Sequence, residues 1–424
     1  MKRLFLRFIG GRQTLLFFSS SLLLTLLTTN LALADFTEPQ SQQGEYLTLA
    51  GNCKGCHTTL GGKPYAGGRK LQTPFGEFVT PNITPDIETG IGQWTKEDFW
   101  QAMHHGKAKD GRYLYPVFPY IEYTKVTRQD SDKIFDYLRS LPRVAHANPP
   151  HRIDPPYDNQ FLLFLWRTWY FEEGVYKPDS SKSEEWNRGA YLVQGLGHCT
   201  ACHTSRNVWG ASQDGELQGG EIMGTFWYAP SLISPLEAGM GDWPLETIVE
   251  LLSTGITNHA VTSGPMATIV RESLQHLSAA DMRAMAVYLQ SIGKKEIDIK
   301  KTRKIPPMPE AVRQYLAKGE LIYEKHCQDC HGESGQGVSN IYPPLAGNRS
   351  VTLTSPLNTI RSVLYGGYPP STAGNKRPYG MPPYQHIIHD TEIAQVVSYI
   401  RNAWGNFGSL VNQFDVDDSR GYEY

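Results

Sequence analysis

Apolar positions recur at helical spacing in three similar stretches of the chain, and each stretch predicts the same series of helices. A leading helix is followed by a loop, a middle helix, a second loop and a closing helix. The leading helices contain Gly44, Gly189 and Gly319 and run toward the first cysteine of each module. The middle and closing helices are expected at 94–106 and 127–141, at 243–255 and 278–292, and at 357–366 and 391–404. The pattern therefore predicts a mainly α-helical chain of three tandem modules.

The amino-terminal segment predicts an export signal. Four basic residues precede an apolar run from Leu15 to Leu33, and Ala32-Leu33-Ala34 is a suitable cleavage site before Asp35. We interpret residues 1–34 as a signal peptide, with an uncleaved anchor as the alternative, because the apolar run is long. Either outcome delivers the rest of the chain outside the cytoplasm, so we expect a periplasmic protein.

A second apolar segment, Phe161 to Phe171, lies between the first two modules. Its eleven residues cannot cross a bilayer, which requires about 20. We interpret it as a helix that fills the seam between modules. The alternative is a surface that contacts a partner subunit or a membrane.

Length, charge and motif content argue against some classes of function. The chain has 424 residues, which suggests two to four domains, and its 40 basic and 42 acidic residues give a net charge of −2. No dense basic tract is present, which argues against a nucleic-acid partner. No Gly-x-Gly-x-x-Gly string follows a strand pattern, so the sequence does not predict a dinucleotide site.

The chemistry of the chain is concentrated in three Cys-x-x-Cys-His strings, one in each module. They use all six cysteines, at Cys53 and Cys56, Cys199 and Cys202, and Cys327 and Cys330. This string attaches a c-type haem: the two thiols add to the porphyrin vinyl groups and the histidine binds the iron. Disulfides and zinc ribbons are the alternatives, but the threefold repeat disfavours both. The proximal ligands are therefore expected to be His57, His203 and His331.

The sequence thus predicts three tandem class I cytochrome c domains, each built around one covalent haem, with three haem c groups in total. The domain boundaries are placed at 42–142, 186–293 and 310–407, with a connector at 143–185, a basic linker at 294–309 and a polar tail at 408–424.

Methionine is the usual second axial ligand in a cytochrome that relays electrons. Met266 lies 63 residues after His203, and Met381 follows His331 by 50 residues. Both stand beside glycine and proline in predicted loops, which would hold the sulfur in place with little loss of entropy. We therefore expect these two methionines to be the distal ligands of the second and third haems.

The first module departs from this pattern. Phe118 lies 61 residues after His57, at the position where a methionine is expected. Phenylalanine has no lone pair, so two alternatives stay open. The first iron could be open or water-bound, or it could recruit Met103, His104 or His105 from the middle helix.

Several strings resemble a known family, the three-haem cytochrome c subunits of bacterial periplasmic dehydrogenase complexes that oxidise alcohols, aldehydes, gluconate or fructose. The similarity extends from about residue 42 to residue 407. The strings that carry it are Asn82-Ile-Thr-Pro-Asp86, Trp186-Asn-Arg-Gly-Ala-Tyr-Leu192 with Gly197-His-Cys199, Trp227-Tyr-Ala-Pro230 and Pro343-Pro-Leu-Ala-Gly-Asn348.

The resemblance implies an electron-transfer subunit rather than a self-contained enzyme. A dehydrogenase catalytic subunit with flavin or pyrroloquinoline quinone would supply electrons, and ubiquinone, another cytochrome or an oxidase would accept them. Association with the membrane surface is a further implication. Two other functions stay open: a haem enzyme or ligand sensor that uses an open first haem, and a free-standing electron carrier.

Overall fold

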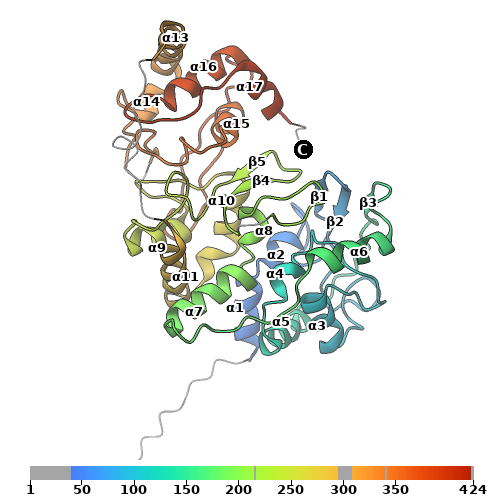
Figure 1. Cartoon of the computed structure of the whole chain (residues 1–424). Helices are drawn as coiled ribbons and strands as arrows, with labels where there is room; N and C mark the ends of the chain where they lie inside the picture. Colours follow the sequence, from blue (N-terminus) through green and yellow to red (C-terminus); the bar gives the residue numbers. More distant parts are fainter. Residues whose placement is uncertain (1–39, 214–215, 295–307, 340, 422–424) are drawn as a thin grey trace, which may run out of the picture. The chain divides into compact units, whose positions relative to one another are not determined.

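The structure is a computed structural model that describes residues 40–213, 216–294, 308–339 and 341–421. The expected signal peptide at 1–34 and most of the basic linker lie outside the described residues. Below, the first, second and third modules are residues 42–142, 186–293 and 310–407 of this chain. Figure 1 labels their helices and strands in chain order.

The first module contains five helices and two strands among its described residues. They are α1 (Gln40–Ala50), α2 (Cys53–Cys56), β1 (Lys70–Thr73), β2 (Gly76–Val79), α3 (Lys96–His105), α4 (Tyr120–Tyr123) and α5 (Arg128–Ser140). The expected middle and closing helices are α3 and α5. Thr95 caps α3 by accepting a 3.1 Å hydrogen bond from the Asp98 amide, and the Asp98 carboxylate accepts one from the Thr95 amide. The connector adds β3 (Arg152–Ile153) and α6 (Gln160–Tyr170).

The second and third modules repeat the series. The second has α7 (Glu184–Tyr191), a π-helical turn η1 (Leu192–Leu196), α8 (Thr200–His203), β4 (Gly220–Ile222), β5 (Trp227–Ala229), α9 (Leu245–Thr254), α10 (Gly264–Glu272), η2 (Leu274–His276) and α11 (Ala279–Ile292). The third has α13 (Glu310–His326), α14 (Gln328–His331), α15 (Leu357–Tyr365) and α16 (Asp390–Ile400). The periodicity therefore located every middle and closing helix.

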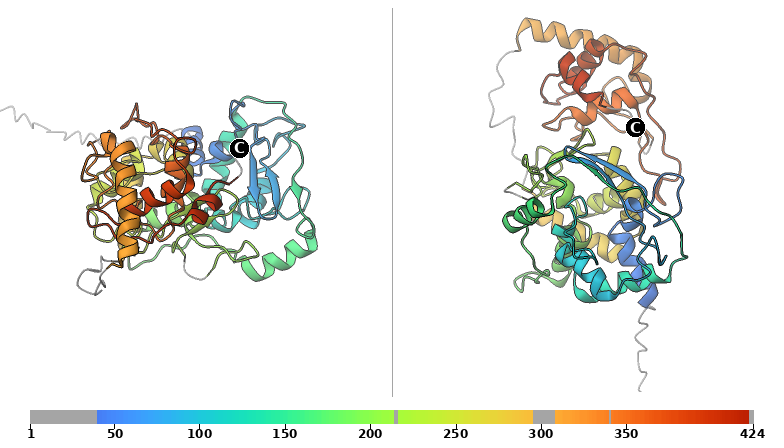
Figure 2. Two further views of the ribbon diagram at one scale, coloured as in Figure 1. Left: turned by 90° about the horizontal axis from the view of Figure 1, so that it is seen from above. Right: turned by 90° about the vertical axis from the view of Figure 1, so that its right-hand side faces the viewer.

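The polar tail is structured where it is described. It contains α17 (Gln413–Ser419), which packs against α15 and α16, with Val416 fully buried. Figures 1 and 2 show α17 gathered with the other helices of the third module. A polar composition alone did not reveal this helix, because one buried valine in seven residues leaves little periodicity.

The leading and closing helices of each module cross in close contact, and a glycine stands at each crossing. A Cβ atom on Gly44 would lie 2.2 Å from the Lys133 carbonyl oxygen, and one on Gly189 would lie 2.0 Å from that of Ala284. In the third module a Cβ on Gly319 would approach the Gln395 carbonyl to 2.1 Å. The glycines therefore let α1 meet α5, α7 meet α11 and α13 meet α16 at a distance that no other residue permits.

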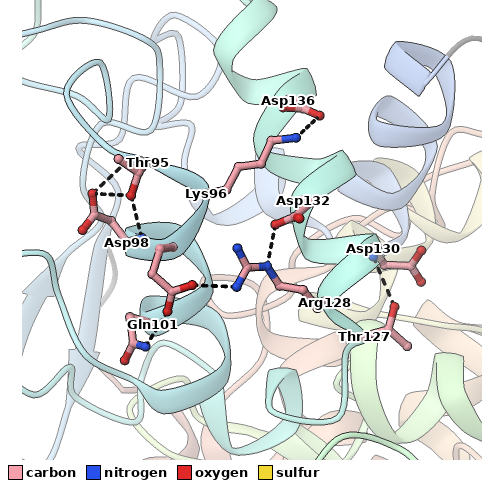
Figure 3. A network of polar contacts seen from close by, with 10 residues as sticks. Thr95, Lys96, Asp98, Gln101, Thr127, Arg128, Asp130, Asp132 and Asp136 are labelled. Atoms are coloured by element: carbon pink, nitrogen blue, oxygen red, sulfur yellow. Dashed lines mark hydrogen bonds and ion pairs between the residues drawn. The ribbon is translucent and has the colours of Figure 1, made fainter.

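Charged residues join the middle and closing helices of the first module on the solvent side (Figure 3). Arg128 at the start of α5 contacts Glu97 of α3 at 2.6 Å and Asp132 one turn along at 2.8 Å. Lys96 contacts Asp136 at 2.7 Å. These pairs are exposed and fix the orientation of α3 against α5 more than they add stability.

Short strands, which the periodicity did not predict, line the loops after the first two motifs. β1 pairs antiparallel with β2, with Lys70 opposite Val79, and β3 of the connector pairs with β2. β4 pairs antiparallel with β5 in the second module. At two to four residues each, these strands are too short for an alternating pattern to stand out.

The first two modules share one hydrophobic core, whereas the third has its own. A single cluster of buried residues extends from Leu47 to Leu289 and includes Phe135, Leu192 and Met285. A separate cluster extends from Tyr323 to Val416. The three predicted domains are therefore not equally independent, because the first two share their core. Their motifs are therefore held in one packed body.

Polar contacts attach the third module to the second. The Asn358 amide pairs with both backbone groups of Tyr228 in β5, at 2.9 and 2.7 Å. Arg349 donates to the Gly239 carbonyl at 2.7 Å and lies over the Trp243 ring. The second and third modules are thus joined by polar contacts, whereas the first two are joined by a continuous apolar core.

The apolar connector segment is helical, as expected, but only one face of it fills a seam. Among its residues only Leu163 and Arg167 are buried, and Trp166 Nε1 donates to the Trp209 carbonyl of the second module at 2.9 Å. Phe161 and Trp169 are 65% and 73% exposed. The interpretation as a simple seam helix is therefore incomplete, because α6 also presents an exposed apolar face. Within the described ranges, no helix has the length and apolar character needed to span a bilayer.

Candidate haem-attachment sites

Each Cys-x-x-Cys-His string contains a single helical turn; it follows the leading helix closely in the first and third modules, and follows η1 in the second. In the first module Asn52 adopts a left-handed conformation, with φ of 50°, between α1 and α2. The turn brings Cys53, Cys56 and His57 to one side of the module. The second and third strings form the turns α8 and α14.

All three motif histidines are held by a proline carbonyl. His57 Nδ1 lies 2.8 Å from the Pro81 oxygen, His203 Nδ1 lies 2.7 Å from the Pro230 oxygen, and His331 Nδ1 lies 3.0 Å from the Pro343 oxygen. A carbonyl can only accept, so Nδ1 carries the proton and Nε2 keeps its lone pair. This hydrogen bond fixes the tautomer and the orientation that a metal ligand needs.

Burial also favours the neutral form of these rings. It lowers the pKa of His57, His203 and His331 below the ordinary value for histidine, although the hydrogen bond to the proline carbonyl acts in the opposite direction. A neutral imidazole is the form that binds iron.

The six cysteines form no disulfide and are partly buried. Burial raises the pKa of Cys53, Cys199 and Cys327 to about 12 and that of Cys202 to about 11. A thioredoxin-like redox pair needs a thiol of low pKa, which these thiols do not have. Thiols in an apolar setting beside an oriented imidazole fit the covalent attachment of haem.

A cavity of about 2000 Å³ adjoins the first two strings. Its wall includes Cys53, Cys56 and His57 of the first module and Cys202 of the second, and it is mainly apolar. Cys56 is close enough to Cys202 for its charge to contribute to the raised pKa of that thiol. The first attachment site therefore faces this cavity, and one thiol of the second borders it.

The residues proposed as distal ligands lie in different settings. Met266 is in the first turn of α10 rather than in a loop, and it packs against the same core as Cys199. Met381 exchanges backbone hydrogen bonds with Gly367, at 2.8 and 3.0 Å, and packs against the third core together with Cys327. Met266 thus belongs to the core shared by the first two modules and Met381 to the core of the third, and ligation by either remains a prediction.

The structure of the first module distinguishes between the candidates for the second axial ligand of its haem. Phe118 and Met103 both line the cavity beside His57. His104 and His105 do not line it, and both direct ring nitrogens toward Glu173 of the connector. The geometry therefore leaves an open iron or ligation by Met103, and it disfavours the two histidines.

Several residues of these sites were not identified from the sequence. They are the prolines whose carbonyls hold the motif histidines, and two arginines that brace the motif turns. Arg206 donates to the Ala201 carbonyl at 2.8 Å, and Arg69 donates to the Gly55 carbonyl in the same way. The prolines lie within or directly beside the strings that carried the family resemblance, which is the signal that could have identified them.

Comparisons with known proteins agree with this geometry. The family model described as cytochrome c matches residues 41–142 and 316–404. The chain is 35% identical over 396 residues to the cytochrome c subunit of a quinone-dependent alcohol dehydrogenase from Gluconobacter oxydans (strain 621H), covering 88% of this chain and 80% of that protein.

Two further relatives extend the comparison. The cytochrome c subunit of gluconate 2-dehydrogenase from Pantoea cypripedii is 34% identical over 381 residues, with 86% of each chain covered. A nicotinate dehydrogenase subunit from Pseudomonas putida (strain KT2440) is 37% identical over 384 residues, which are 88% of this chain but 31% of that longer protein. The threefold motif, the helical modules and these relatives lead to one conclusion: the chain belongs to the family of cytochrome c subunits of dehydrogenases, whose domains carry covalently bound haem c.

Proposed function

We propose that this chain relays electrons along three covalent haems from a partner dehydrogenase to a separate acceptor. The observation that carries the proposal is the threefold repetition of one geometry: two partly buried thiols followed by an imidazole whose Nδ1 donates a hydrogen bond to a proline carbonyl. Bound haem would supply a one-electron redox centre at each site. The protein's contribution is to attach, orient and bury each group.

The number of haems is the first quantity to test. The full chain should contain three haems by pyridine haemochrome assay and by mass. Replacing Cys327 and Cys330 with alanine should leave two, because the third site has its own core and its loss need not disturb the others. A wild-type chain with fewer than three haems would contradict the proposal.

The donor is proposed to be a flavin- or pyrroloquinoline-quinone-dependent dehydrogenase. Support comes from the alcohol and gluconate dehydrogenase relatives, each of which is the cytochrome c subunit of its enzyme. The chain should copurify with such a catalytic subunit, and its haem absorbance should be reduced when that subunit receives its substrate. A chain that copurifies with no dehydrogenase would instead support the free-standing carrier.

Ubiquinone and a downstream cytochrome or oxidase remain the two proposed acceptors. Reoxidation of the prereduced chain by a short-chain ubiquinone, compared with reoxidation by a soluble c-type cytochrome, separates them. Reoxidation by neither would contradict this part of the proposal.

We also propose a periplasmic location, with α6 lying against the membrane surface. The one charged residue of α6, Arg167, is buried over the rings of Tyr113, Tyr120 and Phe171, so its exposed face carries no charge. An uncharged face rich in aromatic residues suits the interface of a bilayer.

Flotation with phosphatidylcholine vesicles tests this placement, with a chain that begins at Asp35 so that the apolar run at 15–33 cannot contribute. Phe161→Ser combined with Trp169→Ser should abolish binding. Phe414→Ser, which removes an aromatic ring that is 78% exposed on α17, should not. Equal binding by the wild type and the α6 variant would contradict the proposal.

A haem enzyme or ligand sensor is the second candidate function, and one observation favours it. Phe118 stands in the cavity beside His57, where it offers no ligand atom to a first haem. The carbon monoxide experiment described in the Discussion decides whether that site accepts an external ligand.

A further inference from the structure

Two histidines and a glutamate converge on the outer side of the first module. They are His104 and His105, the last two residues of α3, and Glu173, which follows α6 in the connector. One nitrogen from each ring and the carboxylate all lie within 4.8 Å of one another. None of the three lines the cavity at the first haem site, so the cluster is separate from the electron-transfer machinery.

The Glu173 carboxylate contacts both histidine rings. Glu173 Oε2 lies 2.7 Å from His105 Nδ1, and its Oε1 lies 3.7 Å from His104 Nε2. The two rings are almost perpendicular, at 87°, with centroids 4.7 Å apart. The three ligand atoms therefore approach a common point from different directions, as coordination by a metal ion requires.

Neighbouring groups fix the orientation of each ligand. The His104 ring stacks on Trp100 at 4.3 Å, and His104 Nδ1 lies 3.3 Å from Thr124 Oγ1. That hydroxyl also accepts a 3.1 Å hydrogen bond from the Gly174 amide, next to Glu173. Supporting hydrogen bonds of this kind orient ligands in metal sites.

The end of α3 is held in place as well. Arg167 donates to the His105 carbonyl at 2.6 Å, and Gly106 ends the helix with a left-handed φ of 57°. A Cβ on Gly106 would lie 2.6 Å from the Tyr120 ring, so this sharp turn requires glycine. The two histidines are thus presented on a rigid helix end, whereas Glu173 comes from the connector.

We propose that His104 Nε2, His105 Nδ1 and the Glu173 carboxylate form a binding site for a divalent transition-metal ion, with Zn²⁺ as the best match. Zn²⁺ is commonly bound by two histidines and one carboxylate, with water in the fourth position. The bound ion would fasten the connector, and α6 with it, to the first module. The function of the site would therefore be structural and separate from that of the haems.

Zinc titration of the untagged holoprotein tests the proposal, since the cysteines are then bound to haem and cannot compete for the metal. After treatment with a chelator, isothermal titration and equilibrium dialysis with metal analysis should detect one Zn²⁺ ion per chain. Glu173→Gln and His105→Ala should each weaken binding at least tenfold. Glu172→Gln removes the neighbouring exposed carboxylate and should leave affinity unchanged.

The haem absorption spectrum of each variant serves as the check on folding, and His105 and Glu173 are exposed enough for substitution. Saturable binding of one Zn²⁺ that Glu173→Gln weakens and Glu172→Gln does not would support the site. Absence of saturable binding, or equal affinity in the two glutamate variants, would overturn it and leave the cluster as a histidine–carboxylate contact.

Discussion

The hydroxyl of Tyr46 on α1 donates a 2.6 Å hydrogen bond to the Asp281 carboxylate on α11 of the second module. The reverse contact is also present: Tyr191 on α7 donates to Asp130 on α5 at 2.6 Å. Each tyrosine lies two residues after its crossing glycine, and each aspartate lies in the first turn of a closing helix. The two modules are therefore joined by reciprocal contacts of the same kind.

Removal of either tyrosine hydroxyl should weaken the joined pair of modules. Tyr46→Phe and Tyr191→Phe should each lower the free energy of unfolding by about 1.5–3 kcal/mol, because each removes a hydrogen bond to a charged carboxylate at the contact between the modules. Denaturant titration followed by haem absorbance measures the change. Tyr170→Phe, at a partly exposed ring on α6, is the control and should have little effect. Equal stability of all three variants would show that these contacts add nothing.

The Asp281 carboxylate also predicts a pH dependence. Burial alone would raise its pKa, but hydrogen bonds from Arg188, at 2.8 and 2.7 Å, and from Tyr46 outweigh burial and lower that pKa. A carboxyl group whose pKa is lowered by folding stabilises the protein above its unfolded-state pKa of about 3.9. That stabilisation is lost as the pH falls through the folded-state pKa.

The difference in unfolding free energy between the wild type and Asp281→Asn should therefore shrink as the pH is lowered from 6 toward 3. Thermal unfolding at a series of pH values measures it. The exposed Asp418→Asn variant is the control and should follow the wild type throughout. A difference that stays constant or grows in acid would contradict the assignment.

The crossing glycines predict a steric effect. Gly189→Ala should lower the free energy of unfolding by about 1–3 kcal/mol, since the new methyl group would approach the Ala284 carbonyl oxygen to 2.0 Å and force α7 away from α11. Gly174→Ala is the matched control, because no atom lies within 4 Å of its Cβ position. The crossing is less tight than described if the two alanine variants are equally stable.

Phe118 predicts ligand binding at the first haem. Carbon monoxide should bind about one third of the haem in the reduced wild-type chain, since neither His104 nor His105 is directed toward this site. Phe118→Met should abolish that binding by supplying a sulfur ligand. Absorption spectroscopy with and without carbon monoxide measures both.

Met103→Leu separates the remaining alternative. With an open first iron, this substitution leaves carbon monoxide binding unchanged. If the wild type binds no carbon monoxide and Met103→Leu does, then Met103 is the second axial ligand and the prediction for Phe118 is wrong.

The local parts of the fold could be predicted from the sequence. Helical periodicity located the middle and closing helices, and Thr95 with its following acidic residues marked the start of α3. The motif strings identified the attachment residues because the spacing of the two cysteines and the histidine is what haem attachment requires. These features depend on residues a few positions apart, which sequence patterns describe well.

The contacts that assemble the site could not be predicted in the same way. Tyr46 and Asp281 are 235 residues apart, and no periodicity relates them. The proline carbonyls that hold His57 and His203 are backbone groups, which every residue possesses. The exposure of α6 depends on which of its faces meets Trp209 of a different module. Such features arise from long-range packing, on which a local pattern carries no information.

The shared core of the first two modules has a consequence for the order of assembly. As the chain is made from its amino end, α1 and α5 appear early, but the cluster to which Leu47 belongs is completed only when Leu289 has been added. The first two haem motifs must therefore remain in an unfinished fold until α11 arrives, during which their thiols stay accessible for attachment. The third motif waits only for Val416, within its own module and tail. Haem attachment would thus be completed in two stages, first as a pair and then singly.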